Sequence, residues 1–221
     1  MNVTEALESR YTCRAYKAEA LSRQTLEEII KAALHTPSWA NSQPWEVFVA
    51  AGDVLDSLRE SCLERFRSGA APAPDLARPE KWPPAIDERI HALGAARFES
   101  LGIERNDKAA RRAMQENNNR FFGAPAVAYL CMDRTLSAWS IHDLGMLAQS
   151  IMLAAAERGV ASAIAYNLVI YPDLVRAALE IPEELFVIIG IALGYEDAES
   201  NQNRFRSQRR SLEDTVRFRG I

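Results

Sequence analysis

The segment Thr36-Pro37-Ser38-Trp39-Ala40-Asn41-Ser42-Gln43-Pro44-Trp45 holds two prolines, two serines, an asparagine and a glutamine. It runs directly into the apolar stretch Trp45–Ala51, which predicts a strand. Proline fixes the backbone and removes a donor, so the segment should form a rigid loop. Amide and hydroxyl groups donate and accept hydrogen bonds without carrying charge. We therefore expect this loop to hold a flat, polar ligand.

Two further clusters are cationic and lie near opposite ends of the chain. The first is Arg10-Tyr11-Thr12-Cys13-Arg14, and the second is the arginine-rich run from Asn203 to Asp214. A phosphate favours guanidinium and hydroxyl donors at close range. Taken alone, each cluster is more typical of a solvated surface than of a ligand site, and the loop asparagine is more typical of a residue that caps its own turn. Together, the two clusters and the loop point more specifically to a ligand site.

Length and composition favour one large domain, residues 1–221, in a chain able to bury a full core. Hydrophobic residues make up 48% and charged residues 25%, and the net charge is −4, which argues against nucleic-acid or anionic-membrane binding. Met1–Arg10 lacks the apolar run of a signal peptide. Three widely spaced cysteines fit neither a disulfide framework nor a metal site and suit a reducing cytoplasm.

Apolar periodicity predicts alternating helices and strands. Expected helices span Ser22–His35, Asp53–Ser68, Ala85–Leu101, Asn106–Arg120, Ser137–Arg158 and Pro172–Leu179, and expected strands span Trp45–Ala51, Ala126–Met132, Val160–Ile170 and Leu185–Tyr195. Ser22 or Thr25 can cap the first helix, and Asp53 the second. The continuously apolar strand Leu185–Tyr195 should be central. The tail from Glu196 is polar, with order returning at Leu212–Phe218.

Two segments predict features beyond the packed core of one chain. Gly69–Pro84 contains five prolines and is expected to be a surface loop, with a lid as the alternative, that opens an excursion over residues 69–120. The helix Ser137–Arg158 is apolar nearly all round and should be buried on most sides. One sheet cannot cover every face of such a helix, which predicts a homodimer. Its polar residues argue against a membrane span.

Several common catalytic motifs are missing. The three histidines stand alone, and no metal-ligand spacing, Rossmann glycine motif, P-loop or hydrolase elbow occurs, so we expect no metal site. A cofactor that needs neither metal nor Rossmann turn fits this gap, and FMN is such a cofactor.

The pattern R-x-T-x-R followed by P-S-x-x-N-x-Q-P-W resembles the opening of the FMN-dependent nitroreductase family, and the run 203–214 resembles its closing motif. Segments at 119–125, 133–134, 143–146 and 149–155 resemble its nitrobenzoate and dinitroaniline reductase branch. The resemblance covers Arg10 to Phe218. It implies an α+β fold, with a mostly antiparallel sheet flanked by helices, in a domain-swapped homodimer whose C-terminal segments cross between subunits.

The resemblance also assigns roles. It places Arg10 and Thr12, beside Tyr11, with Ser207 and Arg209 at the FMN phosphate, and Arg14 at the flavin N1/O2 edge. Ring-edge and ribityl contacts, made from the partner subunit, fall to Pro37, Ser38, Trp39, Asn41 and Gln43. The backbone donors to the ring fall near Tyr166 and Asn167, although alanine replaces a familiar glycine at 161. Phe121 and Phe122 are candidates for the substrate pocket, with packing as the alternative.

The implied activity is ping-pong reduction of nitroaromatics to hydroxylamines by NAD(P)H, with no protein side chain as nucleophile. Three excursion arginines, Arg78, Arg97 and Arg105, are candidates to pair with a substrate carboxylate, and the sequence does not choose among them. Two rival functions stay open. One is another flavin enzyme of the same fold, such as a reductive dehalogenase, azoline dehydrogenase or flavin-cleaving enzyme. The other is a non-catalytic flavin-binding or acidic-partner-binding protein.

Overall fold

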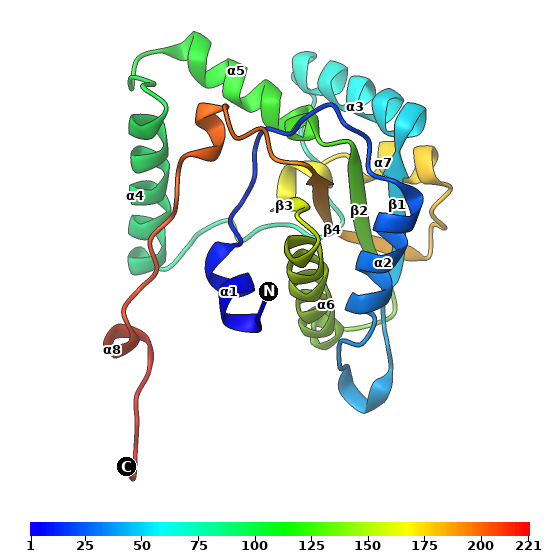
Figure 1. The fold of residues 1–221 in the computed structure, drawn as a ribbon. Helices are drawn as coiled ribbons and strands as arrows, with labels where there is room; N and C mark the ends of the chain where they lie inside the picture. Colours follow the sequence, from blue (N-terminus) through cyan, green and yellow to red (C-terminus); the bar gives the residue numbers. More distant parts are fainter.

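A four-stranded antiparallel sheet forms the centre of the computed structural model, which describes residues 1–221 (Figure 1). Its strands are β1 (Glu46–Ala51), β2 (Ala126–Asp133), β3 (Ala161–Ala165) and β4 (Leu185–Gly194), in the order β1-β2-β4-β3. The expected central position of the last strand is confirmed. Strand β2 is buried on both faces, because its side chains alternate between two separate core clusters.

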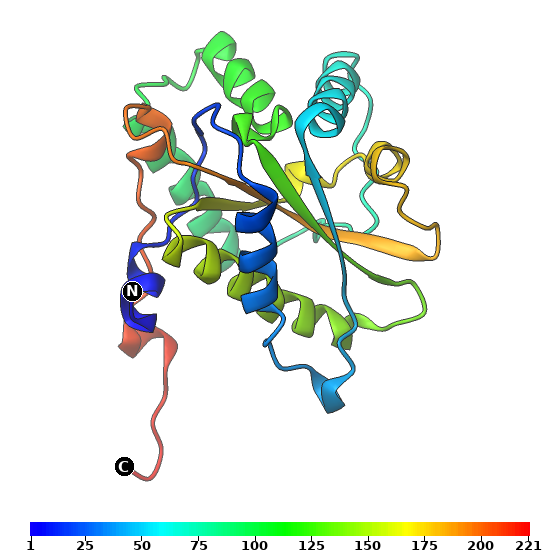
Figure 2. The ribbon, with the colours of Figure 1, turned by 45° about the vertical axis from the view of Figure 1, so that its right-hand side comes forward.

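Helices cover both faces of the sheet (Figures 1 and 2). One core cluster joins α2 (Arg23–Ala33) and α6 (Ala138–Glu157) to the sheet. The other joins α3 (Gly52–Arg67) and α7 (Pro172–Leu179) to the opposite face. Helix α5 (Lys108–Asn119) contacts α3 and ends at the turn η2 (Phe121–Gly123), just before β2. This layered packing gives the α+β architecture expected from the sequence.

Several element boundaries differ from those predicted. A short N-terminal helix α1 (Val3–Ser9), closed by a capping box between Asn2 and Glu5, was not expected. Ser22 caps α2, whereas Asp53 does not cap α3, which starts one residue earlier without a side-chain cap. The strand expected over Val160–Ile170 ends at Ala165, because the turn η3 (Tyr166–Leu168) bends the chain away from the sheet edge.

The first half of the segment Gly69–Pro84 is anchored to the body of the protein. The Asp75 carboxylate is 10% exposed, pairs with the buried Arg176, and accepts a 2.8 Å hydrogen bond from Val187 N in β4. Ala73 N donates to Ile170 O at 2.9 Å. Pro74 and Asp75 are half-buried and the residues on either side of them are exposed, so the segment is a surface loop that is fixed to the body near its middle.

Helix α4 (Pro84–Ser100) follows this segment and has no buried residue. The C-terminal part of the chain carries the turn η4 (Asn201–Asn203) and the one-turn helix α8 (Leu212–Thr215), then extends away from the body in both views (Figures 1 and 2). None of the helices is both long enough and apolar enough to cross a membrane.

Helix α6 is less enclosed than its composition predicts. Trp139 is 65% exposed and His142 beside it is also exposed, and their rings stack with centroids 6.5 Å apart. The opposite face, including Leu147 and Ile151, is fully buried. A single chain therefore covers one face of α6 and leaves its N-terminal apolar face open.

Candidate functional site

The segment Arg10–Arg14 lies along the open edge of β3. Thr12 pairs with Ser162 in an isolated parallel bridge, and Cys13 N donates to Ser162 O at 3.0 Å. Arg14 N donates to Asn203 Oδ1 at 2.7 Å, and Asn117 Nδ2 of α5 donates to the Arg14 carbonyl at 3.2 Å. The segment is thus fixed through its backbone to the sheet edge, to η4 and to α5.

The tail after η4 folds back over this segment. The Arg206 guanidinium lies 3.4 Å from the centroid of the Tyr11 ring. Arg209 donates to Ser207 Oγ at 2.7 Å. Burial, with a smaller contribution from the positive charge of Arg209, lowers the pKa of Arg10. The structure therefore brings together residues from opposite ends of the chain, as the sequence suggested.

We call the following five guanidiniums of this region the arginine cluster: Arg10, Arg14, Arg97, Arg206 and Arg209. Arg10 lies near Arg209, Arg206 lies on the Tyr11 ring, and Arg97 contacts η4, which also holds the Arg14 backbone. None of them forms an ion pair with a carboxylate. Arg10 Nε is buried without a hydrogen-bond partner, and burial also lowers the pKa of Arg14. Buried cations are costly unless they are paired. The cluster is therefore suited to binding an anion, and a phosphorylated cofactor fits its donor set.

The turn η3 lies where β3 ends. Tyr166 and Asn167 line a cavity of about 350 Å³, together with Asn119 of α5 and the loop after α3. The Arg78 guanidinium lies over the Tyr166 ring, 4.5 Å from its centroid. A second, smaller cavity of about 170 Å³ is lined by residues that include Arg10, Tyr11 and Ser162.

The loop Pro37–Gln43 lies elsewhere in the same chain. Trp39 N donates to Asp143 Oδ2 at 3.2 Å, which ties the loop to the first turns of α6. Arg10, by contrast, lines a cavity with Gly159, just beyond the last turn of α6. Asp143 and Gly159 are sixteen residues apart and α6 covers all but the last two, which gives a span of roughly 24 Å at 1.5 Å per residue. One chain does not bring the two predicted motifs together.

The loop is held in an unfavourable backbone conformation. Ala40, Asn41 and Gln43 all have positive φ, of 49°, 55° and 47°. Such a conformation costs a non-glycine residue about 1–3 kcal/mol and persists only where surrounding contacts maintain it. Ser38 Oγ supplies one such contact by accepting from Gln43 N at 2.9 Å. The turn leaves the Trp39 side chain 64% exposed.

Phe121 and Phe122 lie in the interior of the protein. They are 0% and 5% exposed and belong to the core cluster that joins α3 and α7 to the sheet. Side chains buried to this extent pack the interior, which favours packing, the alternative role given above, over substrate contact. Adjacent aromatic residues before a strand have the same appearance in the sequence whether they face the core or a pocket.

Sequence reasoning did not assign three residues that shape the site. Asn203 and Asn117 hold the Arg14 backbone, and Arg206 covers Tyr11. Asn203 and Arg206 lie inside the arginine-rich run that was recognised, so the signal was present without a role. Asn117 belongs to a run of three asparagines in α5, and nothing in the sequence singles out the first of them.

Comparison with known proteins agrees with this arrangement. The family model described as "Nitroreductase family" matches residues 7–195. The chain is 29% identical to a nitrobenzene nitroreductase of Ectopseudomonas oleovorans, over 98% of this chain and 96% of that protein. It is also 29% identical to a 4-nitrobenzoate reductase of Pseudomonas putida, over 96% and 93% of the two chains.

A solved structure extends the likeness to three dimensions. The FMN and NADPH-dependent nitroreductase NfnB from Sphigopyxis sp. strain HMH superimposes with a TM-score of 0.95 at 31% identity, and all of both chains is covered. The family model spans most of the chain, from α1 through β4, and the fold is nitroreductase-like throughout. With the arginine cluster at the edge of β3, these findings establish that the chain belongs to the nitroreductase family.

Proposed function

We propose that this protein is an FMN-dependent NAD(P)H oxidoreductase that reduces nitroaromatic compounds to hydroxylamines. The observation that carries the proposal is the arginine cluster at the open edge of β3, because none of its five cations forms an ion pair with a carboxylate. FMN brings a phosphate dianion, and its bound ring supplies the redox chemistry. The names of similar proteins, which include FMN, NADPH and nitroaromatic acceptors, support the same assignment.

The chain's own residues would bind and orient the cofactor. Arg10, Thr12, Ser207 and Arg209 fit the phosphate, because they combine guanidinium and hydroxyl donors. Arg14 fits the N1/O2 edge of the ring, where a cation stabilises negative charge that develops on reduction. The backbone of η3, near Tyr166 and Asn167, fits the opposite edge, and residues 69–120 would border the acceptor side.

We further propose that the working unit is a homodimer with shared sites. The roughly 24 Å between Asp143 and Gly159 keeps the loop Pro37–Gln43 away from the arginine cluster of its own chain. A second copy would bring its loop to that cluster. The exposed rings of Trp39 and Trp139 beside the open face of α6 favour burial against such a copy.

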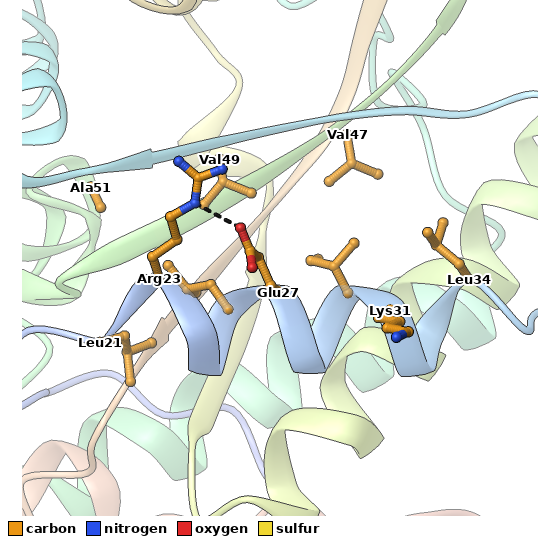
Figure 3. Close-up of a pocket in the computed structure, with 10 residues that line it drawn as sticks. Leu21, Arg23, Glu27, Lys31, Leu34, Val47, Val49 and Ala51 are labelled. Carbon is orange, nitrogen blue, oxygen red and sulfur yellow. Dashed lines mark hydrogen bonds and ion pairs between the residues drawn. The ribbon is translucent and has the colours of Figure 1, made fainter.

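The extended tail has a complementary surface in the same fold. A cavity of about 770 Å³ lies between α2 and the edge strand β1, and its lining is largely apolar (Figure 3). Val47 and Val49 of β1 face Ile30 and Leu34 of α2 across it. Tail side chains of matching character, including Val216 and Phe218, are exposed. We propose that the tail of each subunit occupies this groove on the other.

One spectrum tests the enzymatic proposal. Purified protein should be yellow, should bleach on anaerobic addition of NAD(P)H, and should regain its colour with a nitroarene while a hydroxylamine accumulates. A protein that bleaches but is not reoxidised by any nitroarene would favour another flavin enzyme of this fold. A yellow protein that never bleaches would favour a flavin-binding role, and a colourless protein without released FMN would overturn the proposal.

Complementation tests the shared site. Arg10→Ala and Asn41→Ala chains should each lose FMN as homodimers. A mixed dimer of the two would contain one intact site if cluster and loop come from different chains, and should retain about half of the parent's FMN. Mixed dimers as poor in FMN as both homodimers would refute the shared site.

The three thiols are all free and buried. We propose a reducing compartment, the cytoplasm, as the place where the protein works, since NAD(P)H is available there. Fusion to a fluorescent protein in the source cell would test this location.

A further inference from the structure

Arg97 is the member of the arginine cluster without an evident structural role. It lies in the last turn of α4, a helix with no buried residue, and its one hydrogen bond is a long 3.5 Å contact to Gln202 Oε1. Burial, followed by the positive charge of Arg14, lowers its pKa to about 10. Arg97 is thus a partly desolvated cation that lies beside another cation and has no counter-ion.

The other four cations of the cluster are accounted for by the proposed function. A phosphate dianion would take Arg10 and Arg209, whose charges already interact. Arg14 would take the flavin ring edge. Arg206 stacks on Tyr11 and donates to the Asn203 carbonyl at 2.5 Å. Arg206 and Arg97 therefore have no anionic partner in the cofactor, but Arg206 is engaged by Tyr11 and the Asn203 carbonyl, whereas Arg97 has only its long contact to Gln202.

The structure also separates Arg97 from the other excursion arginines. Arg78 is engaged on the Tyr166 ring. Arg105 lines a different cavity of about 650 Å³ with Ile90 and Phe98 of α4. Arg97 instead contacts η4 through Gln202, and the next residue of that turn, Asn203, accepts a 2.7 Å hydrogen bond from Arg14 N. The position of Arg97 beside the residue assigned to the flavin ring is where an acceptor stacked on that ring would present a substituent.

We propose that Arg97, with Arg14 beside it, binds the carboxylate of an aromatic acceptor and makes this enzyme selective for nitrobenzoates over neutral nitroarenes. The inference rests on the proposed function, and it adds a choice that the similar proteins leave open. Relatives at the same 29% identity include both a nitrobenzene nitroreductase and a 4-nitrobenzoate reductase. A guanidinium pairs with a carboxylate through two parallel hydrogen bonds, which a neutral arene cannot form.

Binding of unreactive ligands provides the first test. Oxidised, FMN-loaded protein is titrated with benzoate and with the neutral analogue benzamide, and the change in flavin absorbance gives each dissociation constant. Arg97→Gln should weaken benzoate binding roughly 10- to 100-fold, the equivalent of one charge-assisted contact. Benzamide affinity and FMN content should not change. Arg97→Lys, which keeps the charge but loses the planar donor pair, should fall in between.

The matched control is Arg89→Gln, which removes an exposed positive charge from the same helix two turns earlier. It should leave benzoate affinity within about twofold of the parent, because exposed charges at that distance are screened by salt. Equal weakening by Arg89→Gln would show a general field effect and overturn the assignment of Arg97.

Turnover gives the second test. Arg97→Gln should raise KM for 4-nitrobenzoate and leave KM for nitrobenzene unchanged. If both KM values rise together, or if FMN is lost, Arg97 serves the cofactor or the fold and the inference fails while nitroreduction stands. If the parent binds benzoate through Arg97 but reduces no nitroarene, the proposed reaction fails and the carboxylate site stands.

Discussion

Gly190 offers a sharp test of the packing beneath the site. It lies in β4 opposite Tyr129 and Ala165, where a Cβ would stand 2.5 Å from Leu168 Cβ and 3.0 Å from Leu168 Cδ1. The shorter contact is about 1 Å inside the usual separation of roughly 3.5–4 Å between carbon atoms. Leu168 cannot rotate away, because the clash involves its Cβ. Gly190→Ala must therefore displace the backbone of η3.

Overpacking of this kind costs about 1–3 kcal/mol. For a chain of this length each kcal/mol lowers Tm by roughly 2–4 °C. Gly190→Ala should thus melt about 2–12 °C below the parent when FMN-loaded proteins are compared at one concentration by circular dichroism. Its reduction by NAD(P)H should also slow, because η3 carries Tyr166 and Asn167.

Gly94→Ala is the matched control. Gly94 lies inside α4, and a Cβ there would meet nothing within 4 Å. Alanine is favoured over glycine in a helix by about 0.5–1 kcal/mol, so this variant should melt at or slightly above the parent temperature. If Gly190→Ala melts with the parent, η3 is not packed against β4 as described, and the reasoning about this turn fails.

Three more predictions follow from individual contacts. Arg10→Ala and Arg209→Ala should each weaken FMN retention by about 1.5–3 kcal/mol, measured by ultrafiltration, and unchanged retention in both would exclude a phosphate at this place. Asp75→Ala should lower the free energy of unfolding by about 3–5 kcal/mol in urea, because it leaves the buried Arg176 with only a 3.8 Å ion pair to the exposed Glu183, whereas a loop without this anchor would give no change. Burial raises the pKa of all three thiols, to about 11 for Cys13 and about 12 for Cys62 and Cys131, above the ordinary value of 9.0. A pKa raised in the folded state stabilises the protein fully below pH 9 and progressively less up to pH 12. The free energy of unfolding should therefore fall as the pH rises across that window. A thiol reagent that labels native protein at pH 8 as fast as unfolded protein would contradict the burial of the thiols.

The sheet and its helices were predictable because the spacing of apolar residues indicates which side chains are buried. The run Leu185–Gly194 is apolar on both faces, which fits only a strand covered from both sides. The end of β3 was missed because Val160–Ile170 stays apolar through the turn at Tyr166. In that stretch the chain leaves the sheet edge but not the core, since Leu168 and Val169 remain buried, and hydrophobicity alone does not register the difference.

The arginines of the site were identified from the sequence, but the residues that contact them were not. Charge pattern and family resemblance selected Arg10, Arg14 and Arg209, which the structure brings near one another. The anchoring of Asp75 by Arg176 and Val187 depends on residues more than 100 positions away, so a proline-rich stretch looked like a free surface loop. The separation of the loop Pro37–Gln43 from Arg10 likewise depends on the length of α6, which intervenes in space and not in sequence.

The two sides of the candidate site are held in different ways, and this bears on how its selectivity can change. Arg10–Arg14 is fixed by backbone hydrogen bonds to β3 and by side chains of η4 and α5, so substitutions around it should disturb cofactor and fold together. Helix α4 buries no residue, so Arg97 is presented from an element that contributes little to the core. Exposed helix positions tolerate substitution at a cost of about 0.5 kcal/mol or less. Acceptor preference can therefore shift through α4 while the cofactor side stays intact, which is consistent with nitrobenzene and 4-nitrobenzoate enzymes standing at equal distance from this chain.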